Sequence, residues 1–400
     1  REGDREITNI AGAAPGAYKI IPAWAEDAEQ NYSAEFLPGT LTIAVARVSN
    51  NGGSIWTYHE YLENSAYSAE TDAPSKQGAF DYAKTLSGDV IIETLCERAV
   101  TTAGDDRYTL SQVSGIELNG DVLNSVTLRT TQDRKFNLDG YVSTITRGYN
   151  GGSLFTSGIP LTLNDIVLDG QKETCVSDAE GGLINMTAGV LTIGSGAVLQ
   201  NSRSENFNGG GAIYMIGGTL TMNGTIQNCE TTGDGGAVSL GENVTAEING
   251  SITGCRAIGG ATKEGEETST GDGGAIKSAG ANVTIGGSAV ISGNTAGSEG
   301  RNGKGGSIYS TGSLTVNGGA AIYGATVESL SLNAVTSNTG AITLPYELYC
   351  PDEFDSASIS LTYSNPLIKA AGISPQDLKI FKFDPYLKNY DTMGGAVNTA

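Results

Sequence analysis

A short motif that occurs six times constrains the fold of this chain more than any other feature. Each copy is a Gly-Gly pair, then a small residue or Leu, then an aliphatic residue. The aliphatic residues follow one another at spacings of 30, 29, 25, 38 and 32 residues, and they are Leu154, Ile184, Ile213, Val238, Ile276 and Ile308. Such self-similarity indicates a repeat architecture, in which stacked neighbours bury a face that one repeat cannot bury alone.

Two more columns of residues run through the same copies. The second is an aliphatic-Thr-apolar triplet, and its threonines are Thr162, Thr192, Thr221, Thr245, Thr284 and Thr315. The third is aliphatic, and its members are Leu168, Leu199, Ile226, Ile252, Ile291 and Ile322. Three short strands separated by Gly or Asn turns are typical of one coil of a parallel β-helix.

The alternatives for a repeated β pattern fit less well. A β-propeller would need longer, four-stranded repeats, and a β-sandwich gives no reason for six copies of one motif. We therefore predict an all-β fold, a parallel β-helix with three short strands per coil and about 8–11 coils.

Glycine accounts for 57 of the 400 residues, whereas proline accounts for 10 and hydrophobic residues for 38%. Collagen would need Gly at every third position and more Pro, and a disordered chain would lack the apolar content. Because Gly adopts positive φ without strain, we expect the excess glycine at the corners of the coils.

The chain divides into four segments. Residues 1–46 contain short strand-like runs and are expected to form a small N-terminal β segment. We expect residues 47–100 to form the N-terminal cap and the first coil, 101–335 the β-helix coils, and 336–400 irregular C-terminal coils or a cap.

One helix is expected, over residues 75–86. Phe80, Ala83 and Leu86 would share one face of it, which is the pattern of a short amphipathic helix. Such a helix would cover the open end of the β-helix and protect its edge strand.

The charge and the single histidine exclude several kinds of function. The net charge of −21 argues against nucleic acid and anionic membrane surfaces as partners, and no apolar run is long enough to insert into a bilayer. His59 lies far from any Ser or Cys motif, so we expect a surface residue and not a catalytic base. RTX and EF-hand calcium motifs are absent from the sequence, and we expect neither a metal nor a cofactor.

The repeats differ in length almost entirely between the third column and the next Gly-Gly pair. These connections are 171–180, 202–208, 230–234, 256–272 and 295–304. They should therefore project from one corner of the stack, and insertions on one face of a solenoid often form its binding face.

That corner supplies the candidate ligand-binding residues. They are Lys263, Glu264, Glu266, Glu267, Asp272, Arg301, Asn302, Lys304, Asn206 and Phe207. The alternative interpretation of the longest connection is a solvated acidic loop with no ligand.

Five cysteines are present, and Cys229 and Cys255 occupy the same position in successive repeats. Neighbouring coils would bring their Cα atoms to about 4.8 Å, which is within disulfide range. Two hypotheses stay open: a bridge between adjacent coils, or a buried stack of small thiols.

The Gly-Gly-Ala-Ile/Val repeats, with aliphatic-Thr-aliphatic strands between them, resemble the right-handed β-helix regions of bacterial adhesin-like surface proteins. The run from Tyr18 to Ile43 is similar to the C-terminal half of the Ig-like MBG modules of such proteins. The resemblance implies a right-handed helix, a partial MBG-type module at residues 1–46, and a secreted or cell-surface location within a larger multi-module chain. It implies no catalytic residues.

These observations lead to a non-enzymatic adhesin or stalk module as the expected function. It would bind a host or microbial surface glycan or protein through the loop corner. The first alternative is a polysaccharide-degrading β-helix enzyme, a glycoside hydrolase or lyase, since two carboxylates in one cleft suffice for glycoside hydrolysis. The second is an ice-binding protein, although the high β-propensity of Thr explains the threonine column equally well.

Overall fold

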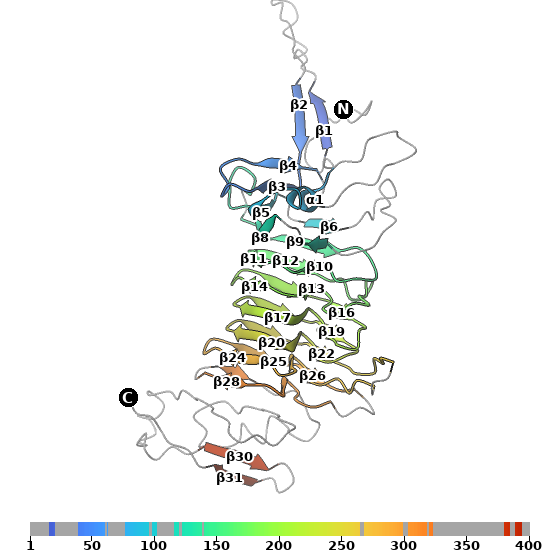
Figure 1. The fold of residues 1–400 in the computed structure, drawn as a ribbon, viewed down its shortest axis with the longest axis vertical. Coiled ribbons are helices and arrows are strands. Elements are labelled where there is room, and N and C mark those ends of the chain that lie inside the picture. The colour runs from blue at the N-terminus through green and yellow to red at the C-terminus, as the bar shows by residue number, and fades with distance from the viewer. Residues whose placement is uncertain are drawn as a thin grey trace, which may run out of the picture.

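The computed structural model describes residues 16–20, 39–60, 62, 77–95, 98–101, 116–119, 122–137, 140–264, 268–298, 303–317, 320–322, 380–384 and 389–393. Within these ranges the chain is nearly all β, and its one helix, α1 (Ala79–Ala83), is five residues long. Parallel strands from successive repeats lie above one another and form tall sheets (Figure 1).

The strands fall into four columns, which we name A to D. Column A contains β7 (Ile116–Leu118), β10 (Phe155–Ser157), β13 (Ile184–Met186), β23 (Ile276–Ser278), β27 (Ile308–Ser310) and the first halves of β17 (Ile213–Met222) and β20 (Val238–Ile248). Column B contains β5 (Gly88–Thr94), β8 (Leu123–Thr130), β11 (Leu161–Asn164), β14 (Val190–Ile193), β24 (Asn282–Ile285), β28 (Leu314–Val316) and the second halves of β17 and β20. Because β17 and β20 run through both columns, A and B belong to one sheet.

Columns C and D are separate parallel sheets. Column C contains β6 (Arg98–Thr101), β9 (Ser143–Arg147), β12 (Ile166–Asp169), β15 (Val198–Gln200), β18 (Thr225–Gln227), β21 (Ser251–Thr253), β25 (Val290–Ser292) and β29 (Ala321–Ile322). Column D contains β16 (Arg203–Ser204), β19 (Glu230–Thr231), β22 (Arg256–Ala257) and β26 (Thr295–Ala296). The fourth column departs from the expected three strands per repeat, because two-residue strands carry too little periodicity to be recognised.

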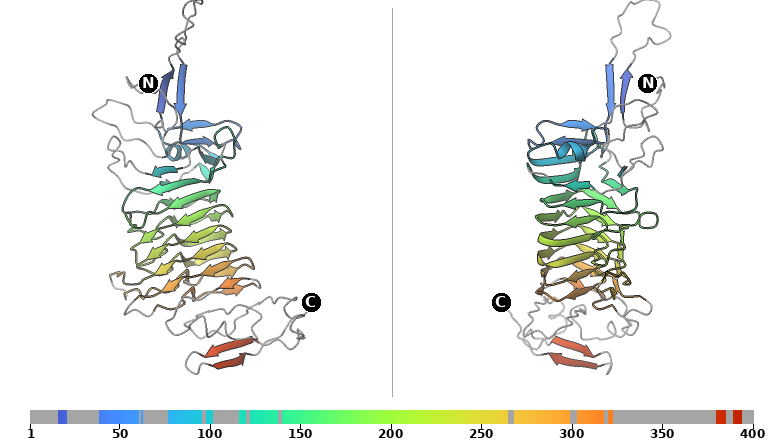
Figure 2. Two further views of the ribbon diagram at one scale, coloured as in Figure 1. Left: turned by 180° about the vertical axis from the view of Figure 1, so that it is seen from behind. Right: turned by 45° about the vertical axis from the view of Figure 1, so that its right-hand side comes forward.

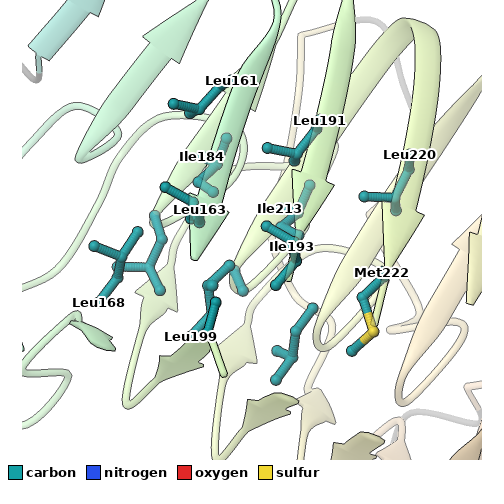
Figure 3. Close-up of a cluster of buried hydrophobic side chains, with 14 of the residues drawn as sticks. Leu161, Leu163, Leu168, Ile184, Leu191, Ile193, Leu199, Ile213, Leu220 and Met222 are labelled. Atoms are coloured by element: carbon teal, nitrogen blue, oxygen red, sulfur yellow. The ribbon is translucent and has the colours of Figure 1, made fainter. Parts of the chain in front are cut away.

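The inward residues of columns A, B and C form the core between the sheets (Figure 3). Leu168 pairs with Leu199, and the same register continues through Ile226, Ile252, Ile291 and Ile322. All six are fully buried, so the third predicted column is confirmed. Each aliphatic residue therefore packs on its counterpart in the next repeat, and the stack removes from water a face that a single repeat would expose.

The predicted register is wrong at two positions, Thr245 in the second column and Leu154 in the first. Thr245 pairs with Thr219 and Asn282, and the place between Thr221 and Thr284 is taken by Glu247. A slip of two residues keeps the same side chains outward, so alternation alone could not exclude it.

In the first repeat the slip is one residue. Phe155, and not Leu154, pairs with Ile184. Both Leu154 and Phe155 are fully buried, so the apolar pattern could not choose between them.

The corners use positive φ as the glycine content predicts. After column C the corner residue has φ between 50° and 64° in four successive repeats, at Asn201, Asn228, Gly254 and Gly293. At the Gly-Gly pairs the constraint is space. A Cβ on Gly236 would overlap the carbonyl oxygen of Gly274 and lie 2.6 Å from the backbone of Arg256.

The N-terminal end of the stack is an antiparallel addition to column B. β3 (Ala46–Ser49) pairs with β5 and with β4 (Thr57–His59). The helix expected over 75–86 is only the single turn α1, which packs on β3 and β5 and brings the Phe80 ring to 5.4 Å from that of Phe155. Residues 84 and 85 leave the helix because Thr85 and Leu86 bond three residues back, to Tyr82 and Ala83, in a terminal turn.

His59 is buried at 6% exposure, contrary to the expected surface position. Its ring lies 4.8 Å from that of Tyr82, and Nδ1 bonds the carbonyl oxygen of Gln77. The Tyr82 ring of α1 thus covers part of the His59 ring.

Two antiparallel hairpins lie outside the stack (Figure 2). They are β1 (Gly16–Ile20) with β2 (Gly39–Ile43), and β30 (Ile380–Asp384) with β31 (Asn389–Met393). Most of the segment expected to form irregular C-terminal coils or a cap, 336–400, lies outside the described residues. The partial MBG-type module at 1–46 stays a prediction.

Candidate ligand-binding corner

The variable connections leave the stack at one corner. Each follows a column C strand, and four of them pass through the two-residue strands of column D before reaching the next Gly-Gly pair. In Figure 1 the column D strands β16, β19, β22 and β26 follow one another along a single edge of the stack. We call this region, residues 171–180, 202–209, 230–234, 256–272 and 295–304, the loop corner.

Alternating charges hold the outer face of column D. Arg203, Glu230 and Arg256 are register partners on three successive strands. Glu230 accepts from Arg203 Nη1 at 3.2 Å and from Arg256 Nη1 at 3.5 Å. The Glu230 carboxylate is the most buried of the three groups, at 11% exposure, and lies between two more exposed guanidinium groups.

Deeper in the loop corner, one ammonium group lies between two carboxylates. Lys277 Nζ is 3.2 Å from Asp234 Oδ2 and 3.6 Å from Asp272 Oδ2. The other oxygen of each carboxylate is held by the loops. Asp234 Oδ1 accepts from Ser269 Oγ at 2.7 Å and from the Asp272 backbone N–H at 2.9 Å.

An aromatic ring covers this group. The Tyr309 ring centroid lies 4.0 Å from Lys277 Nζ and 5.9 Å from Lys304 Nζ. Tyr309 is itself buried at 7% exposure. The cluster of Asp234, Asp272, Lys277 and Tyr309 therefore lies under the loops, where the charges are partly shielded from water.

This cluster was missed in the sequence, although a signal for part of it existed. Tyr214, Ser239, Lys277 and Tyr309 each follow the aliphatic residue of the first column, and they are register partners along column A. Alternation in a strand makes such residues face away from the core. What the sequence did not show is that the connecting loops fold back over them.

The predicted binding residues fall into three groups. Lys263, Glu264 and Lys304 are exposed, and Asn206 and Phe207 are half-buried. Asp272 is buried, with Oδ1 accepting from Thr270 Oγ and from the Lys304 backbone N–H, both at 2.8 Å. Glu266, Glu267, Arg301 and Asn302 lie outside the described residues.

The structure brings Lys263 and Phe207 together from different connections. Lys263 Nζ lies 5.9 Å from the Phe207 ring centroid. Asn206 helps to fix this part of the corner, because its Nδ2 donates to the Asp178 carbonyl and its Oδ1 accepts from the Asn208 N–H. A partly exposed ring with a cation beside it on a fixed loop is a surface that a planar or apolar ligand face can contact.

A second feature is a polar recess of about 240 Å³ at the corner after column C. It is lined by Asp169, Gln171, Lys172, Glu173, Thr174, Asn201 and Asn228. Asp169 accepts from Asn201 Nδ2 at 2.9 Å, Asn228 Nδ2 donates to Asn201 Oδ1 at 2.6 Å, and Lys172 Nζ donates to Asn228 Oδ1 at 2.6 Å. These groups already bond one another, so a ligand here would have to displace the lysine.

Cys229 and Cys255 lie opposite each other in successive repeats, as predicted. The same register position is Ser202 in the repeat before them and Asn294 in the repeat after. Both are free and fully buried, so the bridge hypothesis is not met in this structure. Each thiol donates to a carbonyl oxygen two residues earlier in its own chain, Cys229 to Gln227 and Cys255 to Thr253. Burial raises the pKa of the Cys229 thiol well above its ordinary value, and the neighbouring Cys255 raises it further.

Burial also raises the pKa of Tyr214, and the nearby Glu180 carboxylate adds to the effect. The Tyr214 phenol on column A is therefore neutral at ordinary pH. Within the described residues no group of three or more His, Cys, Asp or Glu side chains gathers as metal ligands do. In the same part of the chain, no helix is long and apolar enough to cross a membrane.

Comparison of the chain with protein-family models, curated proteins and solved structures finds no match.

Proposed function

We propose that the stacked repeats form a right-handed parallel β-helix that acts as a non-enzymatic adhesin or stalk module on a bacterial surface. The proposal rests on the in-register parallel pairing of eight strands in column C and on the three companion columns. Such a stack is stiff because each repeat is hydrogen bonded to both neighbours along its length.

Binding would take place at the loop corner. The single observation that carries this part is that connections of different length meet on one edge of the stack and place the exposed Lys263 beside Phe207. A surface glycan or a surface protein could use this edge, since aromatic side chains and hydrogen-bonding groups serve both. The loops vary while the columns stay constant, as expected where a rigid scaffold presents a binding surface.

The test is a binding screen with the full chain against immobilised host and microbial glycans and surface proteins. For any ligand found, affinity is measured for a corner variant, Lys263→Ser/Glu264→Ser/Phe207→Ala. A control variant, Lys135→Ser/Glu247→Ser, removes one exposed lysine and one exposed glutamate elsewhere. We expect the corner variant to lose at least about tenfold in affinity and the control to bind like the original chain.

Two results would overturn the proposal. One is equal affinity of the corner variant and the original chain for every ligand found. The other is turnover of a bound glycan that stops when one carboxylate is replaced by its amide, since this would make the module a glycan-degrading enzyme.

A further inference from the structure

The Lys277 cluster has the composition and geometry of a reactive site. A primary amine lies 3.2 Å from one carboxylate oxygen and 3.6 Å from a second. Both are ion-pair distances, and they place the amine beside the carboxyl group whose carbon it would attack. The side chains of Lys277, Asp234 and Asp272 are 16%, 23% and 10% exposed, so the loops shield all three.

The two oxygens of Asp234 have different surroundings. Oδ1 accepts two hydrogen bonds, from Ser269 Oγ and from the Asp272 N–H. Oδ2 faces the ammonium of Lys277. Two fixed donors on one carboxyl oxygen stabilise the negative charge that this oxygen would carry in a tetrahedral intermediate, as an oxyanion hole does.

We propose that Lys277 and Asp234 form an intramolecular amide bond, with Asp272 as the proton carrier. Proton transfer leaves Lys277 as a neutral amine and the Asp234 carboxyl group protonated. Nζ attacks Cγ of Asp234, and the charge develops on Oδ1. Asp272 Oδ2 takes the proton from Nζ and returns it to Oδ2 of Asp234, which leaves as water.

The step is balanced without any further reagent. One N–C bond forms, one C–O bond breaks, and one ammonium and one carboxylate become an amide and a water molecule. Nothing is oxidised or reduced. The bond would join the connection before Gly235 to strand β23 of the following repeat, and would therefore prevent the two repeats from separating along the stack.

The molecule contains its own comparison pair. Lys84 Nζ also lies 3.2 Å from a carboxylate oxygen, that of Asp81. This pair lies within one helical turn, and its side chains are 32% and 26% exposed. Among the described residues Lys84 forms an ion pair with Asp81 alone, without a second carboxylate to carry the proton, so we expect no amide bond there.

The experiment is intact mass spectrometry of the full chain in denaturant, followed by tryptic mapping. We expect a mass lower than that of the sequence by one water, a cross-linked peptide pair containing Asp234 and Lys277, and cleavage after Lys84 but not after Lys277. The map separates this cross-link from local cyclisation of an aspartate, which also loses water. Lys277→Arg keeps the charge and should restore the full mass.

Asp272→Asn keeps both reacting groups and removes the proton carrier, so we expect it to react slowly or not at all. An original chain with the full sequence mass and normal cleavage after Lys277 would overturn the proposal, as would a mass loss that persists in Lys277→Arg. Fully formed cross-link in Asp272→Asn would overturn the role of Asp272. If that variant does not fold, the original chain and Lys277→Arg still decide whether the bond exists.

Discussion

The guanidinium of Arg147 donates a hydrogen bond at 2.7 Å to the carbonyl oxygen of Gly182, one repeat further along the chain. The same nitrogen also donates to the Gly152 carbonyl, and the Tyr149 ring lies 4.8 Å from the guanidinium carbon. Arg147 is 1% exposed, and burial lowers the pKa of its guanidinium below the ordinary value. A buried cation thus holds the backbone of two Gly-Gly segments together.

Arg147→Ala should lower the free energy of unfolding by about 2–5 kcal/mol, because it leaves a cavity and removes the side-chain donor from the buried Gly182 carbonyl. Arg256→Ala is the control. Arg256 is 53% exposed and its ion pair with Glu230 is 3.5 Å long, so its loss should cost less than about 1 kcal/mol. Urea unfolding followed by circular dichroism measures both, and equal effects would contradict the structural role of Arg147.

Two glycines at corners should respond differently to substitution. Gly236→Ala should destabilise strongly, by about 3 kcal/mol or more, because the new Cβ meets the backbone of Gly274 and Arg256. Gly254→Asn should change stability by less than about 1 kcal/mol, because Asn tolerates positive φ. Gly254 has φ of 63°, and Asn201 and Asn228 already occupy the equivalent corners at 50° and 54°. Thermal unfolding measures the loss of stability in the two variants. A larger loss in Gly254→Asn than in Gly236→Ala would contradict the conformations assigned to these two corners.

His59 should make stability depend on pH. Burial lowers the pKa of His59 below its ordinary value, and the hydrogen bond to the Gln77 carbonyl offsets this only in part. Nδ1 donates to the Gln77 carbonyl, and the buried Nε2 has no hydrogen-bond partner among the described residues, so protonation would add a charge that none of them pairs. The unfolded chain therefore binds the proton more readily than the folded protein does. The stability that neutral His59 contributes is fully present at a pH above the pKa of His59 in the unfolded chain. It falls as the pH drops towards the lower pKa of His59 in the folded protein.

The measurement is the urea midpoint at about pH 7 and about pH 5 for the original chain and for His59→Gln. We expect the original chain to lose more stability on acidification than the variant does. The same loss in both would show that His59 is not responsible.

The thiols of Cys229 and Cys255 should be unreactive in the folded protein. Both are fully buried, and the raised pKa of Cys229 keeps it protonated. Maleimide labelling with peptide mapping should find both unlabelled in buffer and labelled in urea. Rapid labelling of the folded protein, or a Cys229–Cys255 disulfide in a non-reducing map, would contradict the free, buried pair.

The amino-acid sequence predicts the columns well where one residue type recurs at one place. The aliphatic column from Leu168 to Ile322 matches the observed register throughout. It predicts less well where alternation allows two answers, as at Thr245 and Glu247, or where two large apolar residues are adjacent, as at Leu154 and Phe155.

The candidate site was predictable in place but not in detail. Length variation located the loop corner, because insertions are tolerated only where the chain leaves the stacked columns. The pairing of Lys277 with Asp234 and Asp272 depends on how two connections fold back over column A, and nothing in the local pattern specifies it. Asp272 looked like an exposed ligand in an acidic loop, yet it is buried and bonded to the loop backbone.

Stacking of the repeats in register is the central claim, and disulfide trapping tests it most directly. Thr221 and Glu247 are register partners on β17 and β20, whereas Thr245 lies two residues away along β20. Cα atoms of partners should be about 4.8 Å apart and those of the offset pair about 8 Å, and only the first distance is within disulfide range. We predict that Thr221→Cys/Glu247→Cys oxidises to a disulfide and that Thr221→Cys/Thr245→Cys stays reduced. The opposite result, or no disulfide in either variant, would contradict the register on which the account depends.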